Sequence, residues 1–130
     1  MIQFGRLLSF PLAFRNLEEK VKDVKLEKLV AKKVNDNQIY IEAVANGHNV
    51  QLMIYDKELQ VSSHVQLHCD CKFFAFNLAF GLYQHTSLLH PESFVLVPPK
   101  SKNTSLVLSG CKHVIKVARE IYARKAKIMV

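Results

Sequence analysis

The chain has 130 residues, and its 18 lysines and arginines against 11 acidic residues give a formal net charge of +7. Its composition, 49% hydrophobic and 22% charged, is that of a globular protein and excludes a disordered chain. No apolar run approaches the roughly 18 residues of a membrane-spanning helix, so no membrane span is predicted. The length predicts a single domain over 1–130, and the charge favours an anionic neighbour such as nucleic acid or an acidic protein.

The first segment, 1–14, is an apolar N-terminal arm with three of the eight phenylalanines. It lacks a charged start followed by a small-residue cleavage site, so we do not expect a signal peptide. Pro11 interrupts a helix, and chain ends are loose unless they are tied down. Because loose aromatic side chains rarely stay in water, the arm is expected either to pack on the protein's own core or to insert into a neighbouring subunit.

A short helix near 17–24, with Asn16 as its N-cap, precedes a region from 25 to 68 that has the pattern of an antiparallel sheet. Turn-forming residues at 35–37 and at Asn46-Gly47 separate runs in which apolar residues alternate with polar ones. This alternation is typical of strands with one buried face. The predicted strands cover 26–34, 38–45, 50–55 and 61–68.

The segment 73–83, which we call the Phe-rich helix, has two apolar stripes at helical spacing. A helix that is apolar nearly all round is normally buried on every side, and a chain of this length has little material to cover it. Part of its surface is therefore expected to contact another chain. One stripe contains Phe73, Phe76, Phe80 and Tyr83, and the other contains Phe74, Leu78 and Leu82.

After an irregular segment from 85 to 103, a final amphipathic helix is predicted from 112 to about 124, with Val114, Ile115 and Ala118 on its core side. Its opposite face is basic and could neutralise several phosphates of duplex DNA. A solvated helix face is the other interpretation of such a stripe. The residues concerned are Lys112, Lys116 and Arg119, with Lys127 near the same line.

All three cysteines fall in two short motifs, C-x-C at 69–71 and C-x-H at 111–113. The two-residue period of a strand places both thiols of the first motif on the same side as Leu67. Three thiolates and one imidazole are the ligand set of a tetrahedral structural Zn²⁺ site. The predicted zinc ligands are Cys69, Cys71, Cys111 and His113.

Buried free cysteines acting as small hydrophobic residues are the alternative to a metal site. His68, His85 and His90 are substitute ligands, although His68 points to the other face of its strand. The odd number of cysteines argues against a disulfide framework and for a reducing, intracellular compartment. Because four protein ligands leave no open position for water, we expect a structural rather than a catalytic site, and no enzymatic motif or small-molecule site is evident.

The order C-x-C, a spacer, then C-x-H opening a helix resembles the SWIM-type zinc finger, and the apolar Val114 and Ile115 after the second motif agree with it. The resemblance covers roughly residues 60–125 and implies a zinc-binding region at 69–125. It looks most like the small virion proteins of tailed phages, in which a sheet leads directly into the finger. The spacer is longer than in many eukaryotic members, and no enzymatic domain is attached.

Together these patterns predict an α+β protein with a small antiparallel sheet, flanking helices and a SWIM-like C-terminal half. The expected function is that of a zinc-stabilised assembly protein, a virion component that contacts other subunits through its arm and its Phe-rich helix. The resemblance places it in the virion or the host cytoplasm. DNA binding through the basic face of the last helix is the alternative, and a non-enzymatic role is expected in either case.

Overall fold

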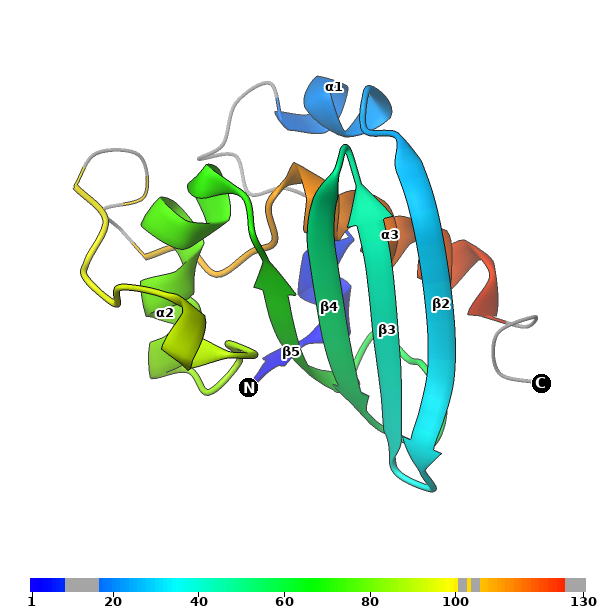
Figure 1. The fold of residues 1–130 in the computed structure, drawn as a ribbon. Coiled ribbons are helices and arrows are strands. Elements are labelled where there is room, and N and C mark those ends of the chain that lie inside the picture. Colours follow the sequence, from blue (N-terminus) through cyan, green and yellow to red (C-terminus); the bar gives the residue numbers. More distant parts are fainter. Residues whose placement is uncertain (9–16, 101–102, 104–105, 126–130) are drawn as a thin grey trace.

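The computed structural model describes residues 1–8, 17–100, 103 and 106–125. In this part of the chain, five antiparallel strands form one sheet in the order β1-β5-β4-β3-β2, as Figure 1 shows. The predicted α+β class is thereby confirmed. The strands are β1 (Ile2–Gln3), β2 (Leu26–Asn35), β3 (Gln38–Ala45), β4 (His48–Tyr55) and β5 (His64–Cys69).

Six short or medium helical elements accompany the sheet in the described residues. None of them combines the length and the apolar character that crossing a bilayer requires. They are the 3-10 helices η1 (Phe4–Leu7) and η3 (Pro91–Ser93), the π-helical turn η2 (Phe74–Leu78), and the α-helices α1 (Leu17–Lys22), α2 (Ala79–Gln84) and α3 (Lys112–Ala123).

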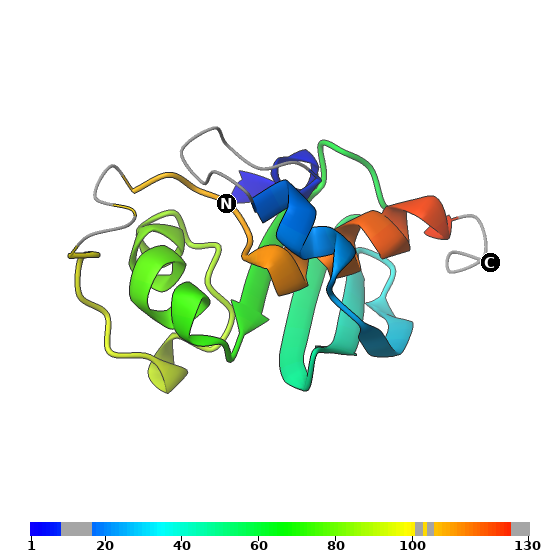
Figure 2. The same cartoon turned by 90° about the horizontal axis from the view of Figure 1, so that it is seen from above.

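The core lies between one face of the sheet and helix α3. Strands β3, β4 and β5 alternate buried and more exposed residues, and the register pairs Ile41 with Leu52 and Leu52 with Leu67 across the buried face. Helix α3 crosses this face in contact with β2, β3, β4 and β5, and it also contacts α1 and η1. Figure 2 shows α3 on one side of the sheet, with no described helix over β2–β4 on the other.

The described part of the N-terminal arm packs on the protein's own core. Ile2 pairs with Val65 of β5, and its backbone N–H donates to the buried Ser87 Oγ at 2.6 Å. The side chains of Phe4 and Leu7 are fully buried. The first of the two expectations for the arm is therefore confirmed for residues 1–8, and 9–14 lie outside the described residues.

The fourth predicted strand begins later than its sequence pattern indicated. Residues 61–63 form a turn, and β5 starts at His64. In that turn Ser63 Oγ donates to Asp56 Oδ2 at 2.8 Å and accepts from the Gln60 backbone N–H at 2.9 Å. The alternation at Val61 and Ser63 was thus wrongly assigned to a strand, because serine hydroxyls that bond nearby groups favour turns over ladders.

The Phe-rich helix forms, but with a π turn inside it. The chain is helical from 72 to 84, and within η2 the Ala79 N–H donates to the carbonyl of Phe74 five residues earlier. One predicted stripe, Phe74, Leu78 and Leu82, is buried. The other is not, since Phe76 is 68% exposed and Tyr83 is 50% exposed.

Candidate metal centre

The four residues predicted as metal ligands meet at one buried point. Cys69 ends β5, Cys71 follows two residues later, Cys111 is the N-cap of α3, and His113 lies in the first turn of that helix. One donor atom from each lies within 4.8 Å of the others, and none of the four residues is more than 5% exposed. The cluster thus joins the two ends of residues 70–110, which we call the excursion.

The local backbone structure places each pair of candidate ligands in the core. The alternation of β5 buries Val65, Leu67 and Cys69 on the face covered by α3, and Cys71 lies on the same side. Before α3, the backbone approaches the helix so closely that a Cβ at Gly110 would lie 2.6 Å from Val114 Cγ1. Only glycine fits there without displacing Val114, and so Gly110 allows Cys111 to enter the core.

The spacing of the donor atoms fits a tetrahedral ion. The Nδ1 atom of His113 lies 3.7 Å from Cys69 Sγ and 3.8 Å from Cys111 Sγ. A tetrahedral centre at about 2.3 Å from sulfur and about 2.0 Å from nitrogen holds its ligand atoms about 3.5 to 3.8 Å apart. The same spacing also identifies Nδ1 as the nitrogen of His113 that faces the centre.

The thiols differ in how easily they ionise. Hydrogen bonds from Cys111 and Cys69 lower the pKa of the Cys71 thiol well below its ordinary value, and the backbone N–H of Phe74 adds a further donor at 3.4 Å. Burial, followed by the contacts with Cys69 and Cys71, raises the pKa of the Cys111 thiol. Because neighbouring thiolates repel one another, three thiols this close favour a single ionised sulfur. A bound divalent cation would allow all three thiols to ionise together.

Three polar residues, His48, Asn49 and Asp70, form a hydrogen-bonded group beside the candidate ligands. The His48 ring packs against the His113 ring at a tilt of 43° with 4.6 Å between centroids, and His48 Nδ1 donates to Asp70 Oδ1 at 2.9 Å. Asn49 Nδ2 donates to the other oxygen of the same carboxylate at 3.2 Å. Asp70 is exposed between the two inward-facing thiols, and its carboxylate binds the His48 ring that packs against His113.

The sequence interpretation missed His48, although the strand pairing carries a signal for it. Val50 pairs with Cys69, and because β4 and β5 are antiparallel, the same register continued by two residues brings His48 opposite Cys71. The alternative ligands lie elsewhere. His68 points to the opposite sheet face, where its ring contacts those of His90 and Phe94, and burial followed by the neighbouring His90 lowers its pKa.

The basic face predicted for the last helix is less open than its spacing indicated. Lys112, Lys116 and Arg119 are all partly buried, and Arg119 Nε donates to the backbone carbonyl of Leu8 at 2.8 Å. This guanidinium therefore ties α3 to the end of the N-terminal segment. Lys127 lies outside the described residues.

Comparison with protein-family models, with curated proteins and with solved structures finds no match for this chain. The site is therefore defined by its own geometry. Four buried cysteine and histidine donors, gathered from a strand end and a helix start, form a candidate metal-binding site.

Proposed function

We propose that this protein is a zinc-stabilised structural or assembly protein, in which one Zn²⁺ is held by Cys69, Cys71, Cys111 and His113. The observation that carries the proposal is the convergence of four buried donors, all within 4.8 Å of one another, from the two ends of the excursion. Structural zinc bound in this way contributes on the order of 10 kcal/mol to the folding of small domains.

Zinc is the ion we propose because of the chemistry of the donors. Three thiolates and an imidazole are soft or borderline ligands, which suit Zn²⁺, whereas Mg²⁺ and Ca²⁺ prefer oxygen. With Zn²⁺ the set has a net charge of −1, and Lys72 and Lys112 each follow a ligand directly in the sequence. Because all four positions are filled by protein, we also propose that the ion is structural and that the protein is not an enzyme.

The order of the ligands supports a SWIM-type centre. The C-x-C motif starts at the end of strand β5, and the C-x-H motif opens helix α3, as in the family that the sequence resembles. From the likeness to small tailed-phage proteins we propose a virion component whose partners are other subunits. Phe4 and Leu7 are used in the chain's own core, and so we assign the contact to the Phe-rich helix.

Duplex binding by the basic face of α3 is the alternative function. Lys112, Lys116 and Arg119 are partly buried, and no observation favours this role over assembly. The alternative predicts duplex binding that falls steeply as salt rises and that Lys116→Glu weakens. Salt-insensitive or absent binding would remove it.

The proposed function is tested by measuring metal content and native mass on the same purified protein. We expect about one zinc per chain, and we expect Cys111→Ser to lose it. His68→Ala is the matched control, because His68 lies on the other sheet face and its loss should leave the zinc in place. A wild-type protein that is fully folded without any bound metal would refute the proposal.

A further inference from the structure

Four of the eight large hydrophobic residues that are about half exposed or more in the described chain lie between positions 76 and 97. Large hydrophobic residues that are about half exposed or more include Phe76 at 68% and Tyr83 at 50% on the Phe-rich helix, and Val95 at 82% and Val97 at 52% on the segment that follows η3. Apolar side chains that line one groove together mark an interaction site, whereas single exposed residues do not.

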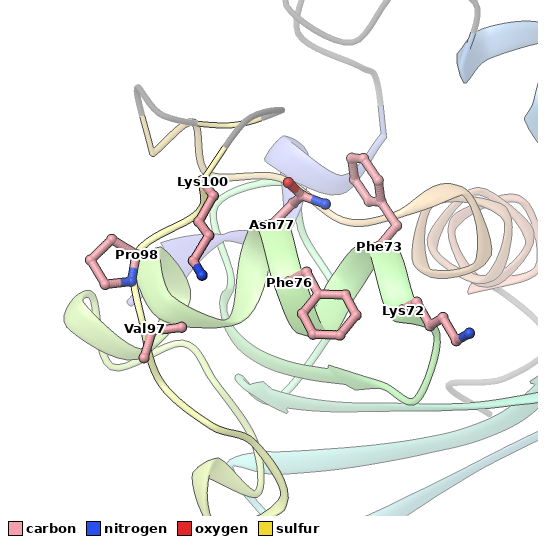
Figure 3. Close-up of a pocket in the computed structure, with 7 residues that line it drawn as sticks. All are labelled: Lys72, Phe73, Phe76, Asn77, Val97, Pro98 and Lys100. Atoms are coloured by element: carbon pink, nitrogen blue, oxygen red, sulfur yellow. The ribbon is translucent and has the colours of Figure 1, made fainter.

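Phe76 and Val97 border one groove, which has a volume of about 540 Å³. Figure 3 shows the Phe76 ring between Lys72 on one side and Val97, Pro98 and Lys100 on the other. We call this feature the Phe76 groove. Its walls come from two separate segments, the start of the Phe-rich helix and the chain at 97–100.

The helical wall of the groove is fixed in place by a buried side chain. Asn103 is 3% exposed, and its Nδ2 atom donates to the carbonyl of Asn77 at 2.8 Å and to that of Val107 at 3.0 Å. Its Oδ1 atom accepts the Val107 N–H at 2.9 Å. Asn77 belongs to the π turn η2, and π turns within helices are frequent at functional sites. The helical wall of the groove is thus tied to the chain at 103 and 107.

The charged side chains that line the groove are all positive. Lys72 and Lys100 line it, no acidic residue does, and among the described residues neither lysine forms an ion pair. An apolar channel with a cation toward each end is complementary to a chain segment that carries apolar side chains between carboxylates. The net charge of +7 would steer such a segment toward the protein.

We propose that the Phe76 groove is the docking site for an acidic, apolar segment of a partner protein. Phe76 and Val97 contact its apolar side chains, while Lys72 and Lys100 bind its carboxylates. The inference deepens the proposed assembly function by naming the surface and the chemistry of the partner. It is separable from the zinc site, because the test variants alter exposed side chains that are not ligands.

The test uses zinc-loaded full-length protein and a fluorescein-labelled peptide with leucine and phenylalanine flanked by aspartates and glutamates. Two further peptides isolate the contributions, one with lysine in place of every acid and one with serine in place of the apolar residues. We expect the acidic, apolar peptide to bind and so to raise the fluorescence anisotropy. Both altered peptides should bind at least about tenfold more weakly. Binding should fall as salt rises.

Matched variants test whether the peptide binds in the Phe76 groove. Phe76→Ser, Val97→Ser and Lys100→Glu should each weaken the peptide about tenfold. Tyr83→Ser, Val95→Ser and Lys33→Glu make the same chemical changes at exposed positions outside the groove and should leave binding unchanged. Metal content and melting temperature, measured on every variant, should stay at wild-type values.

Several results would overturn the proposal. These are no binding of the acidic, apolar peptide to wild-type protein, equal losses in groove and control variants, or self-association that Phe76→Ser abolishes, which would make a second copy the occupant. Tighter binding of an oligothymidylate than of the peptide, lost in Phe76→Ser, would assign the groove to nucleic acid instead. Wild-type protein that is fully folded without bound metal and still binds the peptide would reject the proposed metal role and leave the groove proposal standing.

Discussion

The sheet and the excursion are held together in different ways. Strands β2, β3 and β4 form an antiparallel ladder, and α3 packs against its inner face. The stability of the sheet is therefore spread over many similar contacts. The described part of the excursion has only short helical elements, and it is joined to the rest by a few buried side chains such as Phe74, by the Cys/His cluster and by the bridge between Leu67 and Leu88. Single changes should therefore have global effects in the sheet and local effects in the excursion.

The largest effect is expected from breaking the cluster itself. Cys111→Ser, or removal of the metal by a chelator, should cost several kcal/mol because the proposed ion contributes on the order of 10 kcal/mol. Hydrogen exchange should rise first in the excursion and at the start of α3, and last in β3 and β4. Uniform loss of protection across all strands would show that the two regions are not distinct.

A core substitution in the sheet should behave in the opposite way. Leu52 is fully buried between Ile41 and Leu67, so Leu52→Ala should lower the free energy of unfolding by about 2 to 5 kcal/mol. Chemical denaturation should show a single transition, with the excursion and the sheet unfolding together. Metal content of the folded fraction should be unchanged, and its loss would argue that the sheet shapes the site directly.

Asn103→Ala should have a smaller and more local effect. It removes one hydrogen bond that joins Asn103 to the carbonyl of Asn77 in η2 and two that join Asn103 to Val107, at a cost of about 1 to 3 kcal/mol for the polar groups left unpaired. Exchange should quicken in 74–84 while β3 stays protected. Asn37→Ala, in an exposed turn at the far end of the sheet, is the control and should change neither region.

The smallest effect is expected from the residues around the ligands. Asp70→Asn weakens the contact that holds His48 against His113, and changes of this kind lower metal affinity about tenfold or more. Competition with a chromophoric chelator measures it. Asp36→Asn, in the exposed turn between β2 and β3, should leave metal affinity at the wild-type value; equal affinities for the two variants would remove the supporting role of Asp70.

Much of the fold could be predicted because its patterns are local. Alternation at 38–45 and turn residues at Asn46-Gly47 defined β3 with its bounds as observed, and the helical period from 112 defined α3. The cluster could also be predicted, because a strand period and a helix start place their own ligands. The start of β5 was wrong, since a turn built on Ser63 mimicked two further strand residues.

Other features could not be predicted because they depend on partners far away in sequence. The Asn77 carbonyl in the π turn accepts a hydrogen bond from Asn103, and nothing near Phe74 indicates this distant partner. The groove requires Val97 to lie beside Phe76, an arrangement of two segments that no periodicity describes. Partial burial of Arg119 likewise follows from the carbonyl of Leu8, more than a hundred residues earlier.

The position of the two motifs in the chain has a consequence for synthesis. A ribosome makes Cys71 well before Cys111, and over those 40 positions translation at about 5 to 20 residues per second takes about 2 to 8 seconds. During that interval the first two thiols have been synthesised while the remaining donors and α3 do not yet exist. Cys69 and Cys71 must therefore stay reduced in the nascent protein until α3 has been synthesised and has folded over them.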